Sequence, residues 1–384
     1  MRFLIDFTQI PLKRTGAGVY AENLVRELAP MVNPDDQFFL LLQSDEVVLR
    51  NEVQTADQVR ILSIPSGLFR NRLALMLFEQ LILPWILLFH HIDVIHSLHY
   101  TLPLWSPAAR VVTFHDLTML LTPRMHTRGR RLIMPIYMRL AWKLADAILF
   151  VSAATRKDAE RLFPPSGKVR AVTPLGIGSD AFVTPSASEV QQGLAEIGVS
   201  QPYLLFIGTI EPRKNIVRLI QAFDAVAGQF PDYTLVLAGK FGWDYEPVTR
   251  ALSSSPAAAR IRHLGYITDS AKRILLAGCA ALVYPSLYEG FGLPVLEGMA
   301  AGAPVITSNL SSMPEVAGDA AILVDPALAE QLSTAMQELL SNSALSEEYR
   351  SRGRTRARTF SWTATAQGTY KTYDTVSEMR HTQH

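Results

Sequence analysis

The chain of 384 residues contains a single cysteine, Cys279. One thiol forms neither an intramolecular disulfide nor a zinc site made of thiolates, so we expect a protein of a reducing compartment, the cytoplasm. Charged residues make up only 18% of the sequence, and they nearly cancel to a net charge of +1. Without a strong positive charge the chain is not expected to bind nucleic acid.

Long apolar runs are missing as well. The N-terminal apolar residues meet Asp6 too early for a signal peptide, and they predict a first strand instead. The stretch 73–89 includes Glu79, Gln80 and Pro84 and falls short of the roughly 20 apolar residues that span a bilayer. It predicts a buried or interfacial helix.

What the sequence does contain is enough apolar residues, 48%, for two hydrophobic cores, because a single core rarely grows beyond roughly 250–300 residues. Short strand-like runs alternate with helical patterns such as 217–227 and 328–340, which predicts βαβ units and the α/β class. We expect two Rossmann-like domains facing each other across a cleft, over 1–180 and 200–360, with a linker near 178–200. A C-terminal helix within 361–384 is expected to pack back towards the N-terminal domain. The predicted strands are 3–7, 38–42, 59–64, 94–96, 111–114, 148–151, 169–172, 203–207, 234–238, 261–264, 281–284, 305–307 and 322–324.

Ligands of parallel sheets bind at the carboxyl ends of the strands, where the loop 285–297 is the richest in signals. Pro294 suits the first position of a helix, and the glycines before it, including Gly292, allow a ligand to approach the backbone. The amides from Phe291 to Val295 then face a diphosphate at the helix N-terminus. Glu297, expected in the first turn, suits ribose hydroxyls and Glu289 suits sugar hydroxyls. The alternative is that one acid only offsets the helix dipole and the other is solvated.

A second loop, 208–215, follows another predicted strand. It begins at Gly208 and carries the adjacent cations Arg213 and Lys214, which suit a leaving diphosphate and can take the place of a divalent metal ion. The sequence contains no Asp-X-Asp triplet to hold such a metal. The alternative is an ordinary solvated pair at the start of a helix.

The N-terminal half offers weaker signals. Gly16 and Gly18, in the segment 13–20 between a predicted strand and helix, allow close backbone approach to a sugar or phosphate, although turn geometry alone also explains them. His115 ends a predicted strand and is placed to bond a transferred sugar, or else is a structural histidine.

Two clusters of residues give no firm prediction of a site: a group of histidines and a basic segment. The spacing of four nearby histidines fits no zinc pattern, so no metal site is expected. A basic amphipathic segment suits anionic lipid headgroups or a lipid-diphosphate acceptor, or is simply a solvated face. The histidines are His90, His91, His96 and His99, and the basic residues are Arg124, Arg128, Arg130, Arg131, Arg139 and Lys143.

Over nearly its whole length the chain resembles the retaining glycosyltransferases of the GT-B fold, family 4-like, a group with bacterial mannosyl-, glucosyl- and rhamnosyltransferases. Two motifs carry the resemblance. Glu289 and Glu297, separated by seven residues, match the paired glutamates of the family. The segment 208–215 matches its Gly-Thr/Ser-X-Glu-X-Arg-Lys-Asn motif.

The resemblance implies roles for individual residues. Arg213 and Lys214 would hold the diphosphate, Glu297 the ribose, and Glu289 would lie against the donor sugar. Amides near Phe291, Gly292 and Leu293 would contact sugar and phosphate, and the loop containing Tyr266 would read the base through its backbone. Gly16, Gly18 and His115 match the glycine loop and cleft histidine of the N-terminal domain. His115, Arg213, Lys214 and Glu289 are the residues we expect to be catalytic.

The resemblance also implies a reaction. Similar enzymes use a front-face route without a protein nucleophile, and no cofactor is expected besides the nucleotide-sugar donor. The segment 311–316 favours GDP-mannose or a related GDP-sugar, transferred to a glycan or a polyprenyl-linked glycan, with peripheral contact to the inner face of a membrane left open. Two rival interpretations are a nucleotide-sugar epimerase and a nucleotide-sugar-binding subunit without turnover.

Overall fold

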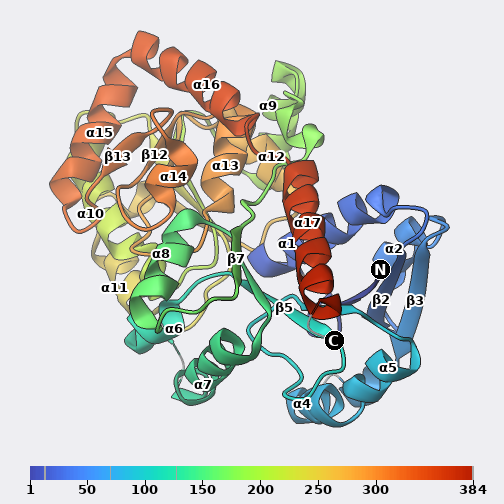
Figure 1. The fold of residues 1–384 in the computed structure, drawn as a ribbon. Helices are drawn as coiled ribbons and strands as arrows, with labels where there is room; N and C mark the ends of the chain where they lie inside the picture. The colour runs from blue at the N-terminus through green and yellow to red at the C-terminus, as the bar shows by residue number, and fades with distance from the viewer. Residues whose placement is uncertain (13, 70, 127, 383–384) are drawn as a thin grey trace. The chain divides into compact units, whose positions relative to one another are not determined.

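The computed structural model describes residues 1–12, 14–69, 71–126 and 128–382. The chain forms two compact units (Figure 1). The first comprises Met1–Arg124, Arg128–Gly176 and Ser361–His384, and the second comprises Ile177–Phe360 with the short segment Met125–Thr127. Each has its own sheet and its own core.

The first unit is built on a parallel sheet of seven strands in the order β3-β2-β1-β4-β5-β6-β7. Helices cover both faces, so the central strands are almost wholly apolar and buried. The strands are β1 (Arg2–Asp6), β2 (Gln37–Gln43), β3 (Val59–Ile64), β4 (Val94–Ser97), β5 (Ala109–Phe114), β6 (Ala147–Phe150) and β7 (Val169–Val172). The helices are α1 (Gly16–Leu28), α2 (Val47–Val53), α3 (Ser66–Phe69), α4 (Arg72–Leu81), α5 (Leu83–Phe89), α6 (Thr118–Leu121), α7 (Arg128–Leu144), α8 (Ala153–Leu162) and α17 (Trp362–His381), with 3-10 turns at Ala29–Met31 and Pro123–Met125.

The second unit is built on a parallel sheet of six strands in the order β10-β9-β8-β11-β12-β13. The strands are β8 (Tyr203–Ile207), β9 (Thr234–Ala238), β10 (Ile261–Gly265), β11 (Ala281–Tyr284), β12 (Val305–Ser308) and β13 (Ile322–Val324). The helices are α9 (Ala187–Ile197), α10 (Ile216–Ala227), α11 (Glu246–Ser254), α12 (Asp269–Gly278), α13 (Leu293–Ala301), α14 (Met313–Ala317), α15 (Ala329–Ser341) and α16 (Ser343–Ala357), with 3-10 turns at Ser179–Phe182, Pro212–Lys214 and Ala258–Arg260.

The last helix, α17, belongs to the first unit although the chain reaches it from the second. It packs on α1 and on β7 (Figure 1). Tyr373 is fully buried there, with its hydroxyl 2.6 Å from Nδ1 of His96. Gly176 lets this helix start close by, because a Cβ at that position would lie 2.0 Å from the backbone nitrogen of Trp362.

The fold class is confirmed: two α/β units, each with a parallel Rossmann-like sheet. All thirteen predicted strands are present, with ends that differ by at most two residues. The stretch 178–200, expected to be the linker, contains the helix α9, whose start is fixed by a capping box between Ser186 and Glu189.

The prediction of one helix over 73–89 is wrong. Two helices, α4 and α5, meet there at Ile82. The break precedes Pro84, which has no amide hydrogen to donate and whose ring would crowd the carbonyl four residues earlier. None of the helices in the described part of the chain is both long and apolar enough to cross a bilayer.

Candidate functional site

The cations Arg213 and Lys214 meet Glu289 in one buried cluster of the second unit. The 3-10 turn Pro212–Lys214 follows β8 and the loop of Glu289 follows β11, and these two strands are neighbours in the sheet. Oε2 of Glu289 accepts a hydrogen bond from Nη1 of Arg213 at 2.7 Å. Its Oε1 accepts from Nζ of Lys214, and from the hydroxyl of Tyr284 at 3.1 Å. Glu289 is therefore not a solvated side chain.

The cluster controls the charge of its members. Burial alone raises the pKa of the Glu289 carboxyl, but Arg213 and Lys214 more than offset this and hold the pKa at about 2. Burial and the charge of Arg213 lower the pKa of Lys214 to about 8, against the opposing effect of Glu289. Nε of Arg213 also pairs with Glu211 at 2.6 Å, so the cluster joins two cations and two carboxylates.

Two serines fix the loop that carries Glu289. Oγ of Ser311 accepts a hydrogen bond from the Glu289 amide at 3.0 Å. The hydroxyl of Ser312 lies 3.0 Å from the Glu289 carbonyl and 2.7 Å from the carbonyl of Phe291. From the sequence, the segment 311–316 indicated only the donor, and the role of its serines in holding the loop was not predicted. Paired hydroxyls at the end of a predicted strand were the available signal.

The N-terminus of α13 offers backbone amides close to this cluster in sequence. The amides of Phe291, Gly292 and Leu293 bond to no protein atom within the described residues, whereas the Val295 amide is taken by the Gly292 carbonyl at 3.0 Å. The expectation for Val295 is therefore wrong, and Pro294 is the second helical residue rather than the first. Three free amides at a helix N-terminus suit an anion.

Gly292 is required by the local backbone. Its φ is +110°, which favours glycine, and a Cβ there would lie 2.2 Å from Cε of Met313. Gly208, at φ +149°, packs against another glycine: a Cβ on Gly239 would lie 1.9 Å from the Gly208 carbonyl oxygen. The group that approaches Gly208 closely is therefore the backbone of Gly239, in the loop that follows β9.

Glu297 lies in the second turn of α13, not in the first as expected. Its Oε1 is 2.7 Å from Nζ of Lys272 on α12, and Lys272 also lies 3.3 Å from Asp269. Burial tends to lower the pKa of Lys272, but Glu297 outweighs it and the net shift is upwards. Lys272 was not predicted from the sequence, because a lysine near the start of a helix belongs to no recognisable motif.

Tyr266, in the loop that leads into α12, is 73% exposed.

The candidates in the first unit form a separate group. Nε2 of His115 donates to the carbonyl of Leu98 at 2.8 Å, and burial lowers the pKa of its ring, so the histidine is neutral at pH 7. Its ring contacts Tyr20, whose helix begins at Gly16. A Cβ on Gly16 would meet no atom within 4 Å, while Gly18 is buried beneath Arg14. The neighbouring Lys13 lies outside the described residues.

One of the four neighbouring histidines, His96, has a structural role in the core of the first unit. His96 is buried between Tyr373 and Thr113, with Nε2 2.8 Å from the threonine hydroxyl, and burial lowers its pKa to about 3. In the part of the chain that the structure describes, no group of three or more His, Cys, Asp or Glu side chains is arranged to hold a metal ion.

Comparisons with known proteins agree along the chain. Residues 14–177 match the model described as Glycosyltransferase Family 4, and residues 193–356 match Glycosyl transferases group 1. The O-antigen chain mannosyltransferase B of Escherichia coli is 32% identical over 371 residues, which cover 93% of this chain and 96% of that protein. The serotype-specific mannosyltransferase WbdA of Escherichia coli is 32% identical over 68% of this chain, which spans about a third of that longer protein (32%).

A solved structure shows the same architecture. HepE from Anabaena, crystallised with UDP and glucose, superimposes with a TM-score of 0.76 at 17% identity, over 97% of this chain and 99% of that one. At this level of identity the likeness concerns the fold.

Proposed function

The chain belongs to the family 4-like glycosyltransferases of the GT-B fold, and from this premise we propose that it transfers mannose from GDP-mannose to a growing glycan, with retention and without a metal ion. The observation that carries the proposal is the cluster of Arg213, Lys214 and Glu289. Glu289 lies in the loop that follows β11, and this loop ends at the free amides at the N-terminus of α13. Cations and oriented amides together supply the charge that a metal ion would otherwise give to a leaving diphosphate.

The cluster supports a route without a protein nucleophile. Both carboxylate oxygens of Glu289 are engaged by cations, and a carboxylate so held is a poor nucleophile and a poor base. We propose that the bond from the sugar C1 to the β-phosphate oxygen breaks while the acceptor oxygen bonds C1 from the same face. The acceptor proton then passes to the departing phosphate oxygen. Arg213, Lys214 and the amides from Phe291 to Leu293 stabilise the negative charge that develops there.

Glu297 is proposed to hold the ribose. Its carboxylate is fixed by Lys272 at 2.7 Å, which leaves acceptor capacity for two neighbouring hydroxyls. Tyr266 and the turn at Gly265 lead into the helix of Lys272, so the base is proposed to lie along this loop. The choice of mannose is supported by the mannosyltransferase relatives, and the choice of guanine rests on the resemblance over the segment 311–316.

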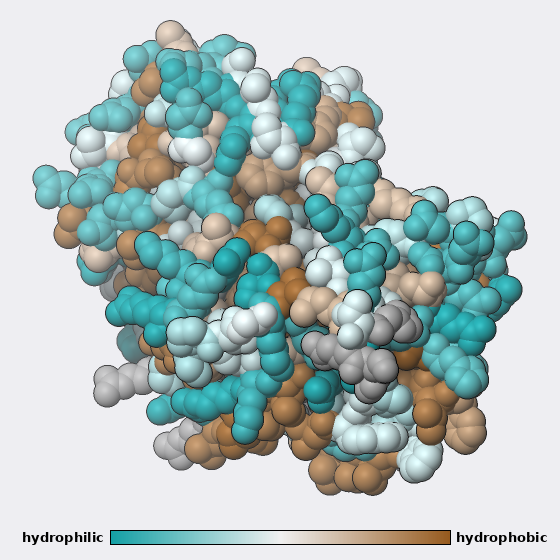
Figure 2. Space-filling view, in the orientation of Figure 1, coloured by the Kyte–Doolittle hydropathy of each residue, from teal (hydrophilic) through white to brown (hydrophobic). Residues whose placement is uncertain are grey.

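For the acceptor we propose a lipid-linked glycan presented at a membrane surface. The support is an apolar stripe on α4 and α5, exposed at four- and three-residue spacing. It is visible as brown surface along the lower edge of the first unit (Figure 2). Trp105 continues it, with its ring 5.9 Å from that of Trp85. The stripe consists of Leu73, Leu77, Leu81, Trp85, Leu88 and Phe89, which are 43% to 76% exposed.

The helix α7 adds both apolar and basic side chains. Leu132, Ile133 and Ile136 are about half exposed or more, at 73%, 49% and 57%. Arg131, Arg139 and Lys143 are exposed on the same helix. The backbones of Arg124, Arg128 and Arg130 are described, but their side chains lie outside what the structure describes. Apolar residues flanked by exposed cations and tryptophan suit an interface with anionic lipids.

The reaction is tested by incubating the protein with radiolabelled GDP-mannose and a polyprenyl-linked mannosyl acceptor in EDTA. Transfer in EDTA, with an α-anomer in the product by NMR, is the expected result. UDP-glucose and GDP-fucose serve as competing donors. Release of GDP with a β-linked product, or transfer that requires added Mg²⁺, would contradict the proposal.

A further inference from the structure

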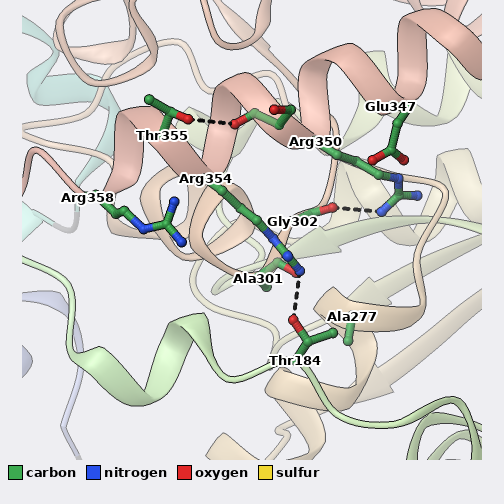
Figure 3. Close-up of a pocket in the computed structure, with 10 residues that line it drawn as sticks. Thr184, Ala277, Ala301, Gly302, Glu347, Arg350, Arg354, Thr355 and Arg358 are labelled. Carbon is green, nitrogen blue, oxygen red and sulfur yellow. Dashed lines mark hydrogen bonds between the residues drawn. The ribbon is translucent and has the colours of Figure 1, made fainter.

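The second unit holds a pocket of about 510 Å³ on α16, away from the loops discussed above. Three arginines line it, Arg350, Arg354 and Arg358, each four residues from the next, so they share one side of the helix. Figure 3 shows all three leaving the same side of α16, above the turn at Ala301 and Gly302. Its volume is within the range of small-molecule sites.

Some of the hydrogen-bond donors of these arginines are already bonded to protein atoms. Nη1 of Arg350 donates to the Gly302 carbonyl at 2.7 Å, and Nη2 of Arg354 donates to Oγ1 of Thr184 at 2.8 Å (Figure 3). The bond of Arg350, together with one from Nη2 of Arg354 to the Ala301 carbonyl at 3.4 Å, caps the carbonyl end of α13. A capping role explains Arg350, but it uses only a fraction of the five donors that each guanidinium carries.

The rest of the charge has no counterpart. Within the described residues, none of Arg350, Arg354 and Arg358 forms an ion pair with a carboxylate. Glu347 is the one acid among the lining residues, so the pocket has three positive charges against one negative. Like charges at this spacing on a helix are destabilising unless an anion offsets them.

Two details point to an anionic ligand rather than to a purely structural cluster. Nε of Arg354 is buried and has no hydrogen-bond partner among the described atoms, whereas Nη2 of the same guanidinium donates to Thr184 and, at 3.4 Å, to the Ala301 carbonyl. Arg358 is exposed, and the contact recorded for it is with the ring of Phe182, at 5.6 Å. The hydroxyls of Ser351 and Thr355 line the same pocket and supply neutral polar groups.

We propose that this pocket binds a phosphate group, either inorganic phosphate or the phosphate of a small sugar ester. Arginine is suited to phosphate because its planar fork donates two parallel hydrogen bonds to phosphate oxygens. Arg354 and Arg358 are the ligands, and Arg350 mainly holds the floor of the pocket. The site is separate from the donor loops and goes beyond the proposed transfer reaction.

The test is a calorimetric titration of the full chain with inorganic phosphate and with glucose 6-phosphate, at constant ionic strength in EDTA. Arg358→Gln is the main variant, since Arg358 is exposed and its side chain donates no hydrogen bond to another residue that the structure describes. Arg352→Gln is the matched control: the same charge change on the same helix, at an exposed arginine outside the pocket that pairs with Glu348. Each titration is repeated in Arg213→Ala, so that phosphate bound at the donor loop is recognised and failure of the proposed function leaves this readout intact.

We expect saturable binding that Arg358→Gln weakens at least about tenfold, the loss of one good charge-assisted contact, and that Arg352→Gln leaves within about twofold. Tighter binding of glucose 6-phosphate would identify a sugar ester as the ligand, and equal affinity would identify the free anion. No saturable binding, or equal weakening in both variants, would overturn the phosphate site.

Discussion

Nη1 of Arg213 lies 2.7 Å from Oε2 of Glu289, so the first glutamate of the paired-glutamate motif is the partner of a cation. The bond ties the loop after β8 to the loop after β11. It also helps to explain how the buried Lys214 can lie beside Arg213: Glu289 pairs with both cations, and Nε of Arg213 pairs with Glu211 as well, at 2.6 Å. A bound diphosphate would meet a preformed cluster.

The first prediction concerns Glu289→Gln, which removes the negative charge and keeps the shape. The buried Lys214 then loses its carboxylate partner and Arg213 keeps only Glu211, so we expect the free energy of unfolding to fall by about 3 kcal/mol. GDP affinity should be equal or higher, because the positive potential rises, while turnover falls by about a hundredfold because Arg213 and Lys214 lose the carboxylate that positions them. Urea unfolding, calorimetry with GDP and a transfer assay measure the three quantities.

The second prediction concerns how the stability of Glu289→Gln depends on pH in the acid range. The pKa of Glu289 is held at about 2, below its ordinary value of 4.5, so its contribution to stability is complete above pH 4.5 and is lost as pH falls towards 2. The stability of the wild type should therefore decline more steeply than that of Glu289→Gln over this range. Parallel curves would show that the carboxylate is not held by the cations, as would a marked loss of GDP affinity at neutral pH.

Lys214 predicts an alkaline limit for donor binding. Its pKa is lowered to about 8, so the free enzyme loses this charge as pH rises from 8 to 9, and the Kd for GDP should increase several-fold. Lys214→Arg is the control, since arginine stays protonated and its Kd should remain flat over the same range. A rise of equal size in both proteins would assign the titration to another group.

Gly292 is predicted to tolerate no side chain. Gly292→Ala should lower stability by about 1–3 kcal/mol, from the positive φ and the clash with Met313, and should weaken GDP binding by disturbing the amides of α13. Gly198→Ala, at the end of α9, is the matched control: its φ is also positive, at +71°, but the atom nearest to a Cβ there is the flexible end of Arg262, at 3.3 Å. If both variants lose the same stability and neither alters GDP binding, the close packing at Gly292 has no functional role.

The apolar stripe predicts membrane binding. The double variant Trp85→Ser with Phe89→Ser should reduce co-sedimentation with vesicles that contain anionic lipid by at least about tenfold, because two large apolar side chains leave the interface. Leu328→Ser removes a similarly exposed apolar residue, 48% exposed, from the other unit and should bind vesicles as the wild type does. Absence of vesicle binding by the wild type, or equal loss in the control, contradicts a membrane role for the stripe.

The strands of both sheets could be predicted from the sequence because buried parallel strands consist of short apolar runs. For example, β8 and β11 begin and end at the predicted residues. The sequence predicted the two loops with the acids and cations for the same reason: they follow those runs. It did not predict that Glu289 bonds both Arg213 and Lys214, nor that Lys272 holds Glu297, because such pairs join residues 25 to 76 positions apart. The break between α4 and α5 does have a signal in the sequence, Pro84, which was used only against a membrane span and not to divide the helix.

The most direct test of the account is calorimetric titration of GDP, UDP, ADP and dTDP in EDTA, against the wild type and Arg213→Ala. The account predicts that GDP binds without metal, that the other nucleotides bind at least about tenfold more weakly, and that Arg213→Ala weakens GDP binding by about ten- to a hundredfold, the usual range for a charge-assisted contact. GDP binding that is unchanged in Arg213→Ala, or that appears only after Mg²⁺ is added, would contradict the assignment of this cluster as the diphosphate site.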